Sequence, residues 1–100
     1  MATISSYKYE TVAASQTAQV LGTTGAIGDR IKKIIVTVTT AATSTVALLD
    51  NTTSVSLVPA VTPVGIYTID FGEQGIVSQI GAWNITTGAG VNLIAIGDFT

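Results

Sequence analysis

The sequence has no cysteine and no histidine among its 100 residues. Without thiols, the chain can form no disulfide framework and no thiolate metal site. Without histidine it lacks the commonest general base, so a nucleophilic serine would have to be activated by Lys8, Lys32 or Lys33. We interpret these lysines as solvated strand residues, because lysine on edge strands deters association between sheets. We therefore expect no enzymatic activity and no cofactor or metal.

Charge is also scarce. Charged residues make up 10% of the chain, against about 25% in an average soluble domain. The net charge of −2 offers no basic surface to nucleic acid. The mean hydropathy is +0.57, yet there is no run of about 18 apolar residues that would form a transmembrane helix. The opening stretch, MATISSYKYE, lacks the basic and apolar regions of a secretory signal. We expect synthesis in the cytoplasm, no membrane or nucleic-acid partner, and a surface covered by another protein.

The six carboxylates are the remaining candidates for acid–base or calcium chemistry. Asp70 and Glu73 lie together in DFGEQG, where the two carboxylates of a glycosidase could be sought. However, Asp29, Asp50 and Glu73 adjoin turn residues, where acidic side chains bond the local backbone, and no EF-hand pattern occurs. The glycine-rich GTTGAIGD (22–29) lacks the Lys-Ser/Thr ending of a phosphate loop. We interpret all these segments as turns and loops.

Beta-branched residues dominate the chain, in segments separated by glycine, proline, asparagine and aspartate. No segment has the i, i+3, i+4 spacing of an amphipathic helix. We predict about eight short strands, at residues 4–12, 17–21, 30–39, 44–49, 53–58, 64–71, 79–86 and 91–96. One hundred residues supply a single core. The prediction is one all-β domain over residues 1–100, an antiparallel β-sandwich or jelly roll.

Two segments have similar sequences: VTTAAT at 38–43 and ITTGAG at 85–90. A predicted strand flanks each segment on both sides. We expect both to be the turns of β-hairpins.

Several predicted strands are apolar on both faces. Alternation places Ile34 with Val36 on one face of the strand at 30–39, and Ile31 with Ile35 on the other. In the strand at 91–96, Ile94 and Ile96 likewise lie opposite Val91 and Leu93. A sandwich strand with one solvated face would alternate between apolar and polar residues. A second subunit is therefore expected to cover the outer faces.

The segment 1–12 is either a first strand or an N-terminal docking arm. Tyr7 and Tyr9 share one of its faces and flank Lys8, and tyrosine is a common interface anchor. The predicted interface therefore consists of Tyr7, Lys8, Tyr9, Ile31, Ile35, Ile94 and Ile96. Trp83 is expected to fill the core.

The segments TTAATSTVALLDNTTSVSLVP (39–59) and GAWNITTGAGVNLIAIGDF (81–99) resemble small virion proteins of tailed bacteriophages, particularly head decoration (cement) proteins. The resemblance covers roughly residues 30–100 and carries no functional motif. It implies a β-sandwich or jelly roll on the outside of an assembled capsid. It also implies a homotrimer that clamps neighbouring copies of the major capsid protein.

The leading hypothesis is therefore a structural virion protein, a capsid decoration subunit that stabilises the phage head from its outer surface. One alternative is another phage part, such as a head fibre, tail or connector protein. Another is a carbohydrate-binding or adhesin module that uses Tyr67 and Trp83 as sugar platforms.

Overall fold

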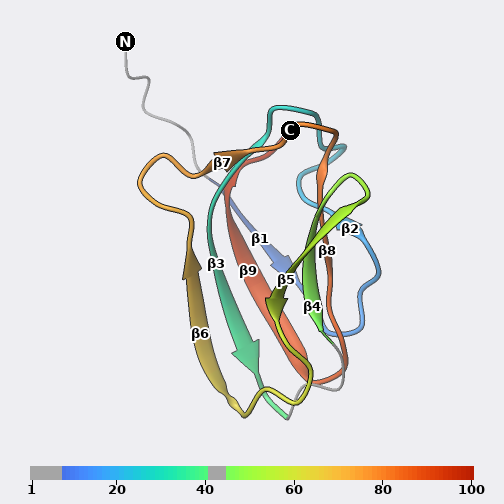
Figure 1. The fold of residues 1–100 in the computed structure, drawn as a ribbon, viewed down its shortest axis with the longest axis vertical. Helices are drawn as coiled ribbons and strands as arrows, with labels where there is room; N and C mark the ends of the chain where they lie inside the picture. The colour runs from blue at the N-terminus through green and yellow to red at the C-terminus, as the bar shows by residue number, and fades with distance from the viewer. Residues whose placement is uncertain (1–7, 41–44) are drawn as a thin grey trace.

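The computed structural model describes residues 8–40 and 45–100, and these residues form nine strands and no helix. The strands are β1 (Lys8–Val12), β2 (Gln19–Val20), β3 (Arg30–Val38), β4 (Val46–Asp50), β5 (Thr53–Val58), β6 (Gly65–Asp70), β7 (Ile76–Val77), β8 (Trp83–Thr86) and β9 (Val91–Asp98). They build two antiparallel sheets. The five-stranded sheet has the order β1-β9-β3-β6, with β7 also paired to β3, and the four-stranded sheet has the order β2-β8-β4-β5 (Figure 1). The predicted all-β antiparallel sandwich is confirmed.

The core lies between the two sheets, where side chains alternate inward along each strand. Ile34, Val36 and Leu93 come from the five-stranded sheet, and Leu48 and Ile85 come from the four-stranded sheet. Each such buried side chain stabilises the fold by about 1.5–3 kcal/mol. Because this core is made only of side chains between two layers, the outer face of each sheet is left for other roles.

Trp83 is buried in this core, as predicted. Its indole N–H donates a hydrogen bond of 2.8 Å to the backbone oxygen of Asp29. The ring thus fills space between the layers while its one polar atom is satisfied.

Ile31 does not share a face with Ile35, and this part of the prediction is wrong. The register of β3 against β9 shifts between Ile31 and Lys33, and such a bulge changes the alternation of side chains by one residue. Ile31 is therefore 0% exposed and packs in the core with Ile34.

The predicted hairpins at 38–43 and 85–90 are instead connections between the two sheets. β3 lies in the five-stranded sheet and β4 in the other, while β8 and β9 are divided in the same way. The two connections meet at one end of the sandwich, the lower end in Figure 1, where the backbone N–H groups of Thr39 and Thr40 donate to the oxygen of Gly90 at 2.8 and 3.4 Å. Residues 41–44 of the first connection lie outside the described residues.

Candidate interaction surface on the five-stranded sheet

The outer face of the five-stranded sheet is arranged in three rows of side chains. Residues directly opposite each other in an antiparallel pair project from the same face. The rows are Tyr9–Ile96–Lys33–Asp70, Thr11–Ile94–Ile35–Thr68 and Asn92–Thr37–Ile66. The apolar members run diagonally across the sheet, and we call Tyr9, Ile35, Ile66, Ile94 and Ile96 the apolar patch.

The apolar patch is open to solvent. Tyr9 is 72% exposed, Ile66 71% and Ile94 37%, while Ile35 and Ile96 are half-buried by their neighbours. A single exposed aliphatic residue is ordinary on a protein surface. Neighbouring ones on adjacent strands of one face are typical of a surface that binds another protein.

The rows of the opposite outer face expose no large apolar side chain. The four-stranded sheet presents the rows Val20–Asn84–Leu49–Ser54 and Thr86–Ala47–Ser56. Hydroxyl and amide groups alternate here with small or half-buried apolar residues. The Asn84 side chain also donates to the backbone oxygen of Asn51 at 3.2 Å. The two faces of the sandwich are therefore not equivalent, and the apolar patch belongs to one of them.

The structure brings together four of the seven residues of the predicted interface. Tyr9 lies opposite Ile96, and Ile94 lies opposite Ile35. Ile31 offers no surface because it is in the core. Lys8 projects to the other side of β1 from Tyr9, and Tyr7 lies outside the described residues. Ile66, which sequence reasoning missed, joins the patch because β6 pairs with β3.

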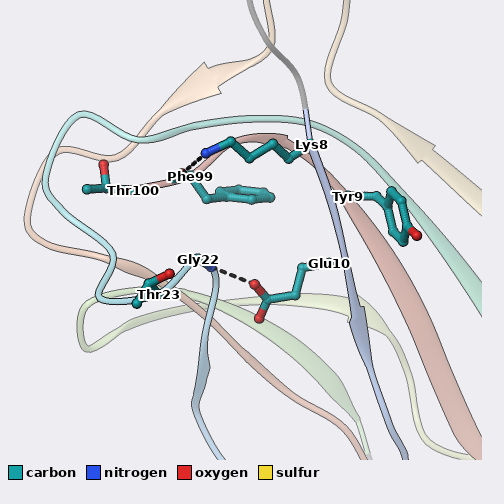
Figure 2. A pocket seen from close by; sticks show the side chains of 7 residues that line it. All are labelled: Lys8, Tyr9, Glu10, Gly22, Thr23, Phe99 and Thr100. Atoms are coloured by element: carbon teal, nitrogen blue, oxygen red, sulfur yellow. Dashed lines mark hydrogen bonds between the residues drawn. The ribbon is translucent and has the colours of Figure 1, made fainter.

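Lys8 and Glu10 face a pocket of about 240 Å³ beside β1, lined also by Tyr9, Gly22, Thr23, Phe99 and Thr100 (Figure 2). Lys8 Nζ donates to the backbone oxygen of Phe99 at 3.3 Å. Glu10 Oε1 accepts the backbone N–H of Gly22 at 2.7 Å, and Oε2 accepts the side-chain amide of Gln19 at 2.9 Å. Both charged side chains of β1 thus fasten the strand to neighbouring segments, and this gives them a structural role.

Of the aspartates predicted to bond the local backbone of a turn, Asp29 does so, whereas Asp50 bonds a segment far away in the sequence. The buried Asp29 carboxylate accepts the backbone N–H groups of Ala26 and Thr100, each at 3.0 Å, and the Thr100 hydroxyl at 2.6 Å. Asp50 accepts backbone N–H groups of the segment 79–81. In the described part of the chain no three acidic residues gather to hold a metal ion.

No helix in the described ranges is long and apolar enough to cross a membrane. No protein-family model matches the chain, and no curated protein or solved structure matches it either.

Proposed function

We propose that this chain is a structural subunit that binds other proteins of an assembly through the apolar patch, and that the assembly is a phage capsid. In this proposal the chain is a decoration (cement) protein on the outer surface of the head. The single observation that carries it is the exposed apolar patch on one outer face, whereas the apolar side chains of the other outer face are half-buried.

The physical basis of binding is burial of the patch against the shell. Apolar area removed from water contributes about 25 cal/mol per Å². Tyr9 supplies a large ring at one end of the patch, and Ile94 lies at its centre. In the three rows of this face the only charged residues are Lys33 and Asp70, at one end of the first row, so covering the apolar patch desolvates few ions. The resemblance of 39–59 and 81–99 to decoration proteins supports the capsid and its major protein as partner.

Co-sedimentation tests this proposal directly. The purified chain is mixed with a panel of DNA-emptied heads of tailed phages, and the bound fraction is measured over a range of concentrations. We expect saturable binding to one shell, and at least a tenfold weaker affinity for Ile94→Lys, which places a charge in the middle of the patch.

Ala47→Lys is the matched control, because it adds the same charge to the outer face of the other sheet, on the interior strand β4. It should bind the shell like the unmodified chain. Saturable binding that Ile94→Lys leaves unchanged, or an absence of binding to every shell, would contradict the proposal. Labelling of whole virions distinguishes the head from a fibre, tail or connector, which are the remaining virion alternatives.

The carbohydrate-binding alternative requires exposed aromatic rings at Trp83 and Tyr67, and neither ring is exposed. Trp83 is buried and donates to Asp29, so its ring offers no surface to a sugar. Tyr67 is half-buried against the core, and its hydroxyl donates to the backbone oxygen of Pro63 at 2.8 Å. We therefore do not retain this alternative as a second proposal.

A further inference from the structure

The edge strand β5 (Thr53–Val58) is built in a way that leaves it open to another strand. It ends the four-stranded sheet and, within the described ranges, pairs only with β4. Its sequence, TSVSLV, contains no charge and no proline, and its first four residues are exposed. An edge of this kind presents unpaired backbone N–H and C=O groups to any strand that approaches.

The other edges carry features that oppose such pairing. β1 bears Lys8 and Glu10, and β6 ends at Asp70. β2 and β7 are only two residues long, too short to guide a partner strand. Charges and short strands are the usual means by which proteins protect sheet edges. β5 lacks both.

We infer that β5 pairs antiparallel with β5 of a second copy of this chain about a two-fold axis at Val55. The pattern of the strand is complementary to itself in this arrangement. Ser54 and Ser56 lie on the outer face of the sheet, whereas Val55 lies on the inner face opposite Leu48. The two-fold axis places Ser54 opposite Ser56 of the second copy, and Val55 opposite the second copy's Val55. Hydroxyl thus meets hydroxyl, and apolar meets apolar.

Charge and exposure favour a second copy as the occupant. Antiparallel pairing of a strand with itself brings any charge near its centre close to a like charge, and this destabilises the pair. β5 has no charge to repel. Val55 is 52% exposed as the edge of one copy, and its counterpart covers it. The contact is isologous, so it closes at two copies and joins two four-stranded sheets into one.

Because the chain has no cysteine, an introduced cysteine is its only thiol, and disulfide cross-linking reports on that position alone. Directly opposite residues in an antiparallel pair have Cα atoms about 4.5–5.5 Å apart, within the range that a disulfide spans. Val55→Cys should therefore form a disulfide-linked dimer under mild oxidation at least ten times faster than Ile94→Cys. The latter is the matched control, since it places the thiol on the apolar patch of the other sheet.

Light scattering supplies the second measurement, with no cross-link. The unmodified chain should reach the mass of a dimer as its concentration rises. Val55→Lys and Ser56→Lys should each raise the dissociation constant at least tenfold, while Ile94→Lys should not. Two lysine variants are used so that a folding defect in one, detected by thermal melting, does not decide the test.

A monomer at every concentration, a closed oligomer other than a dimer, or a dimer unaffected by both lysines would overturn this inference. The inference does not rest on the capsid proposal. A trimer that binds shells would overturn the pairing of β5 and leave the decoration function standing. A dimer that binds no shell would support the pairing of β5 and contradict the decoration function.

Discussion

The carboxylate of Asp50, at the end of β4, accepts the backbone N–H of Gln79 at 2.8 Å. The N–H groups of Ile80 and Gly81 donate to the same carboxylate at 3.2 and 3.1 Å. Partial burial acts to raise the pKa of Asp50, but these three hydrogen bonds together outweigh it, so the pKa lies below its ordinary value. A single side chain thus holds the loop that leads into β8.

Replacing this carboxylate should destabilise the fold in a pH-dependent way. Because the pKa of Asp50 is lower in the folded state, its contribution is present above the unfolded pKa of about 3.9 and is lost as the pH falls through the folded pKa. Asp50→Asn should cost about 1 kcal/mol of unfolding free energy at pH 7. The cost should shrink as the pH is lowered below about 4. Urea denaturation at a series of pH values measures it. Glu73→Gln, in an exposed loop, is the control, and a cost independent of pH would contradict the prediction.

The same hydrogen bonds explain one limit of the sequence prediction. The strand at 79–86 was predicted to begin four residues before β8 begins at Trp83. Residues 79–81 resemble a strand in composition, but their N–H groups bond Asp50 instead of a neighbouring strand. The sequence pattern around residues 79–81 does not show that the acceptor of their hydrogen bonds is Asp50, which lies far away in the chain.

The sequence predicted only part of the apolar patch, because alternation along one strand does not show bulges or which strands are neighbours. Strict alternation correctly set Ile94 apart from Leu93, because β9 is regular. Alternation failed for Ile31, because the bulge in β3 turns this side chain from the outer face to the core. It also gave no reason to include Ile66, because membership of a row depends on which strands are neighbours. Strand order depends on the whole fold, and no single segment of the sequence determines it.

Gly90 offers a test of how closely the two inter-sheet connections pack. Its φ is +78°, and an added Cβ would collide with the hydroxyl of Thr40. Gly90→Ala should therefore lower the free energy of unfolding by about 2–3 kcal/mol, more than backbone strain alone would. Gly72→Ala is the matched control, because its φ is +93° and nothing lies within 4 Å of the added Cβ.

Gly72→Ala should cost only about 1 kcal/mol, the strain of the left-handed region. Adding Thr40→Ala to Gly90→Ala should restore part of the loss, since it removes the hydroxyl that the new methyl group meets. Equal costs for the two glycine variants in chemical denaturation would show that the connections are not packed against each other as described.

Val61 holds a strained conformation that a substitution should relieve. Its φ is +66°, which is unusual for a β-branched residue, and its side chain is exposed in the loop between β5 and β6. The loop is fixed on both sides of its tip: the Thr62 hydroxyl donates to the oxygen of Pro59 at 2.6 Å, and Tyr67 donates to that of Pro63. These bonds hold the backbone at Val61 in place.

Asparagine tolerates the left-handed region better than valine does, so Val61→Asn should stabilise the fold by about 1 kcal/mol. Thermal and urea unfolding measure the change. Val64→Asn is the control, because Val64 is also exposed in this loop but is not among the residues with positive φ, and we expect its stability to change by less than about 0.5 kcal/mol. If both variants shift stability equally, loss of an exposed apolar side chain is the cause, and the strain at Val61 contributes nothing measurable.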